Sequence, residues 1–483
     1  MQYVVIQRIL GLLLALFSLT LLPPMAIAWW FQEGAEIAFS LAFVITISFG
    51  LVLWFPVRHV RNDMRLRDGF IVVVLFWAGL GLTGAVPLAL SDYPHMSFTD
   101  AVFESLSALT TTGATVITGI DALPTSILFY RQELQWLGGM GIIVLAVAIL
   151  PLLGIGGMQL YRAETPGPIK DSKLTPRITE TAKALWYIYL ALTVSCALLY
   201  WLAGMSFFDA LAHSFSTVSI GGFSTHDLSI GYFDNKLIDA IAVVFMLLAG
   251  VNFTLHFLAW RNMNLKPYYY DTELKAYLSV LMSICIITCS YLIYKDVYKD
   301  PGTAITHGIF QTISIATTTG YTTATYQSWP NFLPVLLLFA SFLGACAGST
   351  GGGLKVIRIV LLFKQGMREI KRLIHPNAII HIKLGDRPVQ EPIINAVWGF
   401  FASYVAVFAI MMLLLMATGL DQVTAFSAMA ACMNNLGPGL GDVSAHYGNI
   451  NNPAKWILCI AMLLGRLEIF TLLVLLTPTF WRK

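Results

Sequence analysis

The chain has 483 residues, of which 57% are hydrophobic and only 11% are charged, and its mean hydropathy is +0.74. Soluble domains carry about 25% charged residues, so this composition excludes an ordinary soluble protein and predicts an all-α polytopic membrane protein. The formal net charge of +3 is small, and no nucleic-acid partner is expected. The cysteines are interpreted as free apolar thiols, because they lack the spacing of metal ligands or disulfides. They are Cys196, Cys285, Cys289, Cys346, Cys432 and Cys459.

A membrane-spanning helix needs about 20 consecutive apolar residues, and the chain offers a series of such runs. In chain order we expect spans at 9–30, 36–56, 69–90, 126–155, 185–204, 235–258, 275–294, 331–363, 392–419 and 453–478. The first run resembles a cleaved signal peptide, because Arg8 precedes it and small residues lie near its end. A retained first helix is favoured, because the apolar run continues into Trp29 and Trp30.

Lysine and arginine accumulate in short cytoplasmic loops, and alternate loops of this chain differ strongly in charge. With the N-terminus inside, the inner side holds 21 of the 29 basic and 10 of the 26 acidic residues, whereas the outer side, counted with the outer ends of the spans, holds five basic and 15 acidic residues. Both termini are therefore expected in the cytoplasm. An acidic outer mouth would raise the local concentration of cations.

Four of the outer connections carry related sequences that are too long for simple turns and too apolar for soluble loops. Aligned on one glycine, they read "DAVFESLSALTTTGAT", "DALAHSFSTVSIGGFS", "HGIFQTISIATTTGYT" and "TAFSAMAACMNNLGPG". The reference glycines are Gly113, Gly222, Gly320 and Gly437, and six residues before them stand Ser107, Ser216, Ser314 and Ala431. This internal repetition predicts four copies of one unit, in which a membrane helix, a short half-helix and a glycine turn precede a second membrane helix.

Glycine turns at membrane depth indicate a shared water-filled path. Non-helical backbone is tolerated there only where it is buried in protein or lines a cavity. Glycine adopts positive φ without a Cβ clash, so four such turns around one axis could direct their carbonyl oxygens inward and replace the hydration shell of a monovalent cation. The C-terminal ends of the half-helices, which are partly negative, would favour a cation at the same place.

Several motifs carry a resemblance to a known family, and together they extend over almost the whole chain. They are "FESLSALTTTGAT", "FYRQELQWLGGMGIIVLAVAILPLLGIGGMQLYRAETPGP", "HSFSTVSIGGFSTHD", "GACAGSTGGGLKVIRI", "NNLGPGLG" and "GRLEIFTLLVLLTPTFWR". On these motifs the chain resembles the Trk/Ktr/HKT superfamily of potassium transporters, and within it the bacterial TrkH family.

The resemblance implies potassium uptake across the bacterial cytoplasmic (inner) membrane, with K⁺ as the transported ion, no organic cofactor and no enzymatic activity. It also implies a homodimer and a cytosolic ring of TrkA-type nucleotide-binding subunits that regulates opening. The expected parts are an N-terminal two-helix hairpin at 1–68 and pore repeats at 69–183, 184–274, 275–390 and 391–483. Whether K⁺ moves passively or is coupled to protons or Na⁺ stays open.

Carried over position by position, the resemblance places a K⁺ selectivity filter at the four turns, with backbone carbonyls as the ligands. Its residues are Thr111, Thr112 and Gly113; Ile220, Gly221 and Gly222; Thr318, Thr319 and Gly320; and Asn435, Leu436 and Gly437. Only one glycine is common to all four turns, so K⁺ over Na⁺ discrimination is expected to be weaker than with four identical "TVGYG" loops.

The stretch "GACAGSTGGG" at 344–353 interrupts a span that is otherwise rich in Leu, Ile and Val. Each glycine in a helix interior costs roughly 1 kcal/mol relative to alanine, so this helix is expected to break. The resemblance makes the broken segment a gate below the filter, and a glycine face for helix packing is the alternative. The glycines concerned are Gly344, Gly348, Gly351, Gly352 and Gly353.

Charged residues within spans are costly and suggest a role. Arg466 lies about midway along 453–478 and resembles the family's pore arginine, which projects toward the gating loop; snorkelling to an interface is the alternative. Lys355 and Arg358 directly follow the loop and are ambiguous. His213, Glu104 and Gln311, each nine residues before a reference glycine, are interpreted as polar packing around the half-helices rather than ion ligands.

Two other classes of protein fit the sequence less well than a gated cation pathway. A secondary transporter with inverted repeats also uses broken helices, but all four glycine turns here are expected on one side. A membrane enzyme would need paired carboxylates or an oriented histidine, for which the best candidate is "STHD" at 224–227. That stretch directly follows a filter turn and needs no catalytic interpretation.

Overall fold

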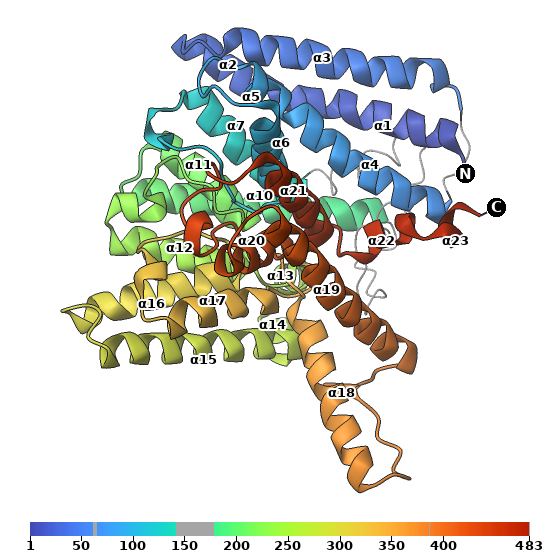
Figure 1. The fold of residues 1–483 in the computed structure, drawn as a ribbon, viewed down its shortest axis with the longest axis vertical. Coiled ribbons are helices and arrows are strands. Elements are labelled where there is room, and N and C mark those ends of the chain that lie inside the picture. The colour runs from blue at the N-terminus through green and yellow to red at the C-terminus, as the bar shows by residue number, and fades with distance from the viewer. Residues whose placement is uncertain (61–64, 142–177, 386, 483) are drawn as a thin grey trace.

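The computed structural model describes residues 1–60, 65–141, 178–385 and 387–482, and in these parts it is a helical bundle (Figure 1). The chain begins with a hairpin of α1 (Tyr3–Ser18), which continues into α2 (Leu22–Phe31), and α3 (Glu36–Trp54). Two glycines let the hairpin close tightly. A Cβ on Gly11 would lie 2.8 Å from the carbonyl oxygen of Gly50, and a Cβ on Gly50 would lie 2.9 Å from that of Gly11.

Four repeats follow the hairpin, and each contains a long helix, a short pore helix and a second membrane helix (Figure 1). The long helices are α4 (Leu66–Gly84), α10 (Ile178–Leu202), α15 (Thr272–Tyr294) and α19 (Glu391–Ala417). The pore helices are α6 (Phe98–Leu109), α11 (Phe207–Ser219), α16 (Pro301–Ala316) and α20 (Gln422–Met433). The second helices are α7 (Thr125–Trp136), α12 (Lys236–Ala249), α17 (Phe332–Leu343) and α21 (Asn452–Arg466).

Shorter elements connect or extend these helices. They are α5 (Val86–Leu90), α13 (Phe253–Asn262), α14 (Lys266–Tyr270), α18 (Val356–Ile374), α22 (Phe470–Leu476) and α23 (Pro478–Trp481). The two-residue strands β1 (Lys383–Leu384) and β2 (Arg387–Pro388) pair antiparallel. Helix α18 projects from the body of the molecule, and the two chain termini lie near each other at one end (Figure 1).

Six helices in the described residues are long and apolar enough to cross a membrane, or eight if two strongly bent pairs each count as one span. They confirm the predicted spans at 9–30, 36–56, 69–90, 185–204, 275–294 and 392–419. The predicted span at 126–155 leaves the described residues after 141.

The second helices differ from the predicted continuous spans. Helix α12 meets α13 at 93°, and α21 meets α22 at 115°. The span at 331–363 breaks between α17 and α18, and α7 runs into a π-helical turn, Leu137–Gly141. The expectation of continuous helices at 235–258 and 453–478 is therefore wrong. Arg466 is also the last residue of α21 and not the middle of a continuous span.

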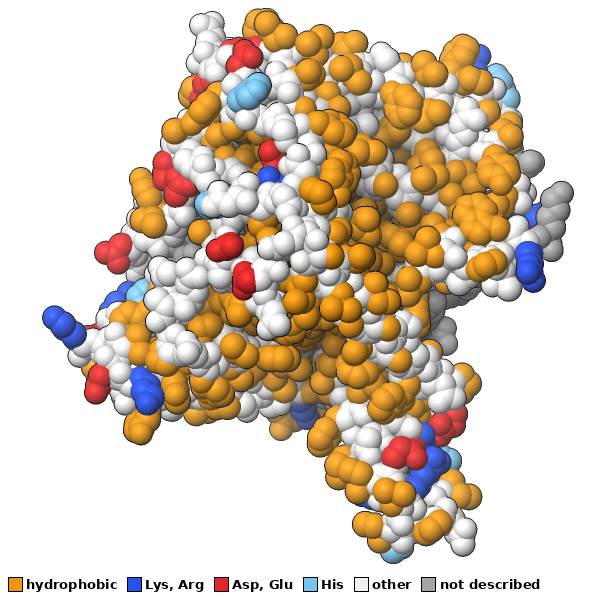
Figure 2. All heavy atoms as spheres, viewed as in Figure 1, with side chains coloured by type: hydrophobic (Ala, Val, Ile, Leu, Met, Phe, Trp, Pro, Cys, Tyr) orange, Lys and Arg blue, Asp and Glu red, His pale blue; other side chains and the backbone are white. Residues whose placement is uncertain are grey.

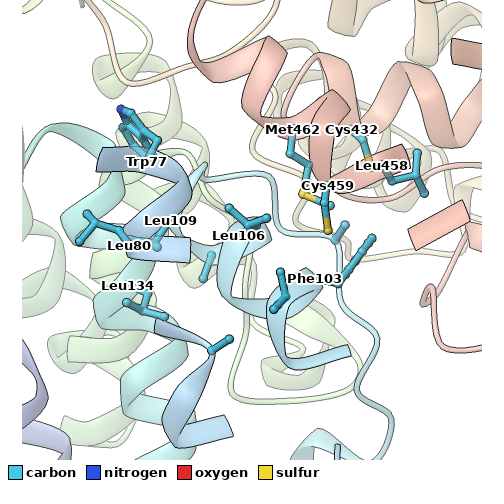
Figure 3. Packing of buried hydrophobic residues seen from close by; sticks show 14 of the residues in the cluster. Trp77, Leu80, Phe103, Leu106, Leu109, Leu134, Cys432, Leu458, Cys459 and Met462 are labelled. Carbon is cyan, nitrogen blue, oxygen red and sulfur yellow. The ribbon is translucent and has the colours of Figure 1, made fainter. Parts of the chain in front are cut away.

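The pore helices lie inside the bundle, whereas many large apolar side chains are exposed on its outside. Every residue of α6 from Ala101 to Leu109 is buried. Figure 3 shows its Phe103, Leu106 and Leu109 in one apolar cluster with residues of α4, α7, α20 and α21. The face shown in Figure 2 exposes many apolar side chains; basic side chains lie near the termini and on α18, and the opposite side carries most of the acidic side chains, with basic ones at its end near α15 and α16. Backbone deep in the bundle can thus contact water only along an internal path.

Candidate functional site

All four pore helices begin at the same kind of cap. Ser97, Ser206, Asp300 and Asp421 each accept a hydrogen bond from a backbone N–H of the first turn, at distances between 2.9 and 3.2 Å. These residue types are favoured at this position because their side-chain oxygens satisfy N–H groups that the helix leaves free. The caps fix where each pore helix starts and therefore where it ends.

The four pore helices also end in the same turn. The residue two before each reference glycine has positive φ, namely Thr111 (53°), Ile220 (56°), Thr318 (70°) and Asn435 (54°), and so do the glycines Gly113 (78°), Gly222 (78°), Gly320 (85°) and Gly437 (96°). In every repeat the residue just before the glycine donates its N–H, at 2.8 Å, to the carbonyl six residues before the glycine. The acceptors are Ser107, Ser216, Ser314 and Ala431, so the conserved spacing reflects a backbone bond that alanine makes as well as serine.

The four glycine turns meet in a closed ring. A Cβ on Gly113 would lie 2.2 Å from the carbonyl oxygen of Gly221, and one on Gly222 would lie 1.9 Å from that of Thr319. A Cβ on Gly320 would lie 2.1 Å from the oxygen of Leu436, and one on Gly437 would close the circuit at 2.7 Å from that of Thr112. Each glycine thus abuts the residue before the next glycine, and a side chain at any of them would displace a carbonyl of this ring.

A buried ion pair supports the ring between repeats 1 and 2. Glu104 accepts hydrogen bonds from Arg131 Nε at 2.8 Å and from the backbone N–H of Val116 at 2.9 Å, and its side chain is 0% exposed. The guanidinium of Arg131 lies over the ring of Phe223, 4.1 Å from its centroid. A side chain of α7 therefore ties together the segments that follow the first two turns.

Two predicted ligand carbonyls also receive hydrogen bonds from side chains. Gln135 Nε2 donates to the Gly221 carbonyl at 2.6 Å, and the Tyr447 hydroxyl donates to the Gly437 carbonyl at 2.8 Å. These contacts make the ring chemically asymmetric. Sequence reasoning assigned no role to Arg131, Gln135 or Tyr447, although the first two lie inside the "FYRQELQW" motif.

The polar residues nine positions before the glycines pack as expected. Glu104 holds the chain after the first turn, Gln311 Oε1 accepts the N–H of Thr323 at 3.1 Å, and His213 Nε2 lies 2.9 Å from Ser224 Oγ. All of them support the chain that follows their own turn. Within the described residues, no group of His, Cys, Asp and Glu side chains could hold a metal ion.

The glycine-rich segment 344–353 leaves the helical path and packs against the inner ends of the pore helices. Gly352 donates its N–H to Thr318 Oγ1 at 2.8 Å, and Gly353 donates to the Asn434 carbonyl at 3.1 Å. Thr350 Oγ1 donates to the Val218 carbonyl at 3.0 Å. The segment therefore contacts the inner end of α11 and the turns that follow α16 and α20, which is not the arrangement of a helix-packing face.

The same segment forms hydrogen bonds with backbone groups at the break between α12 and α13 in repeat 2. Cys346 donates its N–H to the Gly250 carbonyl at 2.9 Å, and Phe253 donates its N–H to the Gly348 carbonyl at 3.0 Å. Lys355, which stands at a positive φ of 74°, donates from Nζ to the Gly351 carbonyl. The glycine segment and the bend between α12 and α13 thus supply hydrogen-bond partners for each other's backbone groups.

Arg466 reaches the same place from repeat 4. Its guanidinium donates to the Thr350 carbonyl at 3.3 Å, to Thr111 Oγ1 at 3.1 Å and to the Gly139 carbonyl at 2.5 Å. It also donates to the carbonyl of Gly138. Arg466 thus bridges the glycine segment, the first turn and the π-helical turn of repeat 1, and it is not a snorkelling side chain.

Arg358, whose role the sequence leaves open, forms a second link between repeats 3 and 4. It is ion-paired with Glu468, and its guanidinium lies 4.2 Å from the centroid of the Phe400 ring. Glu468 and Ile469, between α21 and α22, both have a φ of 52°. The breaks in these two repeats are therefore joined by an ion pair.

The stretch "STHD" at 224–227 forms a connection between repeats 1 and 2 on the outer side. His226 Nδ1 lies 2.5 Å from Asp121 Oδ1, and its other nitrogen lies 3.5 Å from Asp209 Oδ1. Partial burial opposes protonation of His226, but hydrogen bonds to Asp209 and Asp121 raise its pKa above the ordinary value. Ser224 is bonded to His213 and is buried, so the stretch presents no accessible nucleophile.

Comparisons with known proteins agree with this architecture. The family model described as "TrkH: Cation transport protein" matches residues 35–483. The chain is 58% identical to the Trk system potassium uptake protein TrkH of Vibrio parahaemolyticus, over 100% of both chains. It is 59% identical to the protein of the same name from Halomonas elongata, over 99% of both. The crystal structure of the potassium transporter TrkH from Vibrio parahaemolyticus superposes with a TM-score of 0.91, covering 100% of each chain at 55% identity. The chain belongs to the TrkH family of cation transport proteins and is not an enzyme.

Proposed function

We propose that this protein takes up K⁺ across the bacterial cytoplasmic membrane through a single-file pore whose selectivity filter is the ring of four glycine turns. The observation that supports this best is the closed circuit in which each reference glycine abuts a carbonyl of the next turn. A ring of backbone carbonyls suits a weakly hydrated monovalent cation. The relatives named above are potassium uptake proteins, which is consistent with the proposal.

The proposed ligands are the backbone carbonyls of the predicted filter positions. They belong to Thr111, Thr112 and Gly113; Ile220, Gly221 and Gly222; Thr318, Thr319 and Gly320; and Asn435, Leu436 and Gly437. The partly negative C-terminal ends of α6, α11, α16 and α20 would add a field that favours a cation. The hydrogen bonds to the Gly221 and Gly437 carbonyls reduce their electron density, so we expect the four quarters of the filter to contribute unequally.

Ion flux into vesicles that contain only the purified protein tests this proposal. K⁺, Rb⁺ and Na⁺ are compared, and the pH gradient is set independently of the ion gradient. We expect K⁺ and Rb⁺ to enter faster than Na⁺, and a flux that follows the K⁺ gradient alone. A flux that requires the pH or Na⁺ gradient would favour the alternative of a proton- or sodium-coupled symporter, and equal entry of all three ions would refute the filter.

The glycine segment and Arg466 together form the proposed gate. Gly344, Gly348, Gly351, Gly352 and Gly353 allow the segment to lie against the inner ends of the pore helices, and Arg466 holds the Thr350 carbonyl there. A hydrogen bond from a charged donor is worth about 1.5 to 3 kcal/mol. Reversing a 1:99 equilibrium takes about 5.5 kcal/mol, so a few such bonds suffice to keep the segment closed and yet leave it open to regulation.

Removal of these contacts tests the gate. Deleting most of 344–353, or changing Arg466 to Ala, should raise K⁺ flux in the absence of any regulatory subunit. Because Arg466 also contacts Thr111, the K⁺ to Na⁺ ratio should fall in Arg466→Ala, but less than in variants of the ring glycines. Basal flux at the level of the unchanged protein in both variants, with normal folding, would place the gate elsewhere.

We further propose that the protein is a homodimer whose cytosolic face binds a ring of TrkA-type nucleotide-binding subunits, both termini being cytoplasmic. The basic end of α18 is the proposed contact. Arg368 is unsuitable for testing it, because this side chain is 4% exposed and paired with Glu391. Lys371 and Arg372 are the better choice, since Lys371 is exposed and Arg372 is 42% exposed. Charge reversal at both should weaken copurification with the ring, whereas undiminished copurification would remove this surface from the interface.

A further inference from the structure

Glu273 occupies an unusual place on the first turn of α15. Its side chain is buried, with the residue 9% exposed, and one oxygen, Oε1, accepts two backbone N–H groups. The donors are Ala347 at 2.7 Å and Ile357 at 3.2 Å. Ala347 lies within the glycine segment and Ile357 lies in the first turn of α18, so one carboxylate holds the chain on both sides of Gly348–Lys355.

The N–H of Ile357 has a physical need for this acceptor. The first N–H groups of a helix have no partner within the helix, and the residue that precedes α18 is Lys355, whose side chain offers no acceptor. A carboxylate from another helix supplies that acceptor and also suits the positive end of the helix dipole. Glu273 therefore acts as an N-terminal cap for α18 that is provided by α15.

The neighbourhood of this anchor leaves room for movement. An apolar cavity of about 40 Å³ is lined by Ala276 and Tyr277 of α15, by Gly344 and by Val356, among others. Close-packed interiors resist displacement of their side chains, so a cavity beside both ends of the segment lowers the resistance to their movement. The anchor and the cavity lie on the same helix, within four residues of each other in the chain.

We propose that Glu273 is the positioning residue that holds the gating segment closed, by fixing Ala347 and Ile357 to α15. The inference rests on the proposed gate, but the anchoring itself can be measured without ion flux. Release of the carboxylate frees both ends of the segment toward the cavity. The thiol of Cys346, which is 1% exposed and directly precedes Ala347, then becomes accessible.

The test uses Glu273→Ala and Glu273→Gln in the full-length protein, with Lys275→Gln as the matched control on an exposed site of the same helix. The other cysteines are replaced, and the rate at which a water-soluble maleimide labels Cys346 is measured beside K⁺ flux in vesicles. Glu273→Ala should raise the labelling rate at least tenfold, as expected for the loss of one hydrogen bond to a charged acceptor, and should raise basal flux. Glu273→Gln keeps an oxygen that accepts both N–H groups and should rescue most of the effect, and Lys275→Gln should change neither readout.

Each outcome decides a separate point. Unchanged labelling and flux in Glu273→Ala would overturn the inference. Faster labelling without higher flux would support the anchor and refute the gate on which its functional meaning rests. Should Glu273→Ala fail to fold, as judged by gel filtration in detergent, Glu273→Leu keeps the side-chain volume without the acceptor and must give the same labelling result.

Discussion

Replacement of Gly320 by serine tests the carbonyl ring most directly. A Cβ at this position would lie 2.1 Å from the Leu436 carbonyl oxygen and 2.8 Å from Pro438 Cδ, while φ stays at +85°. Contacts below 3.0 Å do not persist, so the neighbouring carbonyl must move. A left-handed conformation also costs a non-glycine residue about 1–2 kcal/mol. If the ring relieves this strain by giving up its spacing, K⁺ over Na⁺ discrimination should fall about 5- to 30-fold, because 1.4 kcal/mol is a factor of ten.

The assay is the relative uptake of K⁺ and Na⁺ into vesicles, with Gly399→Ala as the control. Gly399 lies in α19, where a Cβ would have no atom within 4 Å, and alanine should stabilise a helix there by up to about 1 kcal/mol. Selectivity should be unchanged in the control. An undiminished K⁺ preference in Gly320→Ser, with normal folding, would refute the role of the ring.

Three further predictions concern the Glu104–Arg131 ion pair, His226 and the cavity beside Gly344. Glu104→Leu or Arg131→Met alone should lower the free energy of unfolding by about 3–5 kcal/mol, because each leaves a buried charge unpaired. The double variant should recover part of that loss in an unfolding experiment, whereas additive losses would show that the two residues are not coupled. The raised pKa of His226 means that its stabilising contribution is complete below pH about 6.5 and is lost as pH rises through the raised pKa, so the melting temperature should fall between pH 6 and pH 9 by less in His226→Gln than in the unchanged protein. Ala276→Leu should fill the cavity beside Gly344 and reduce the flux reached on activation while leaving selectivity unchanged, and full activation would exclude the cavity from gate movement.

Much of this architecture is visible in the sequence, because the signals involved are local. Ring glycines need positive φ, half-helices need capping residues, and long spans need uninterrupted apolar runs. The resemblance to the family adds the residue numbers of the proposed filter and gate. The break at 344–353 was also predictable, since glycine strongly opposes a helix interior.

The bends in repeats 2 and 4 were not predictable in the same way. "GVN" at 250–252 and "LEI" at 467–469 carry at most one glycine and lie within apolar runs. These bends depend on partners far away in the chain: Gly250 accepts from Cys346, and Glu468 pairs with Arg358. Prediction from local sequence therefore extends a helix through residues whose polar groups in fact find their partners in another repeat.

The convergence of these irregular segments has a mechanical consequence. The glycine segment contacts the bend of repeat 2 through Gly348, the turns of repeats 3 and 4 through Gly352 and Gly353, and repeat 1 through Arg466. Backbone groups buried at this depth cannot be left without partners, so the segment cannot move alone. If the segment is the proposed gate, its opening exchanges hydrogen bonds with several repeats at once, which favours two discrete states over gradual loosening. Because the same bonds end on residues of the proposed filter, such as Thr318 Oγ1, opening and ion selection are expected to share a structural element rather than lie in separate parts of the pore.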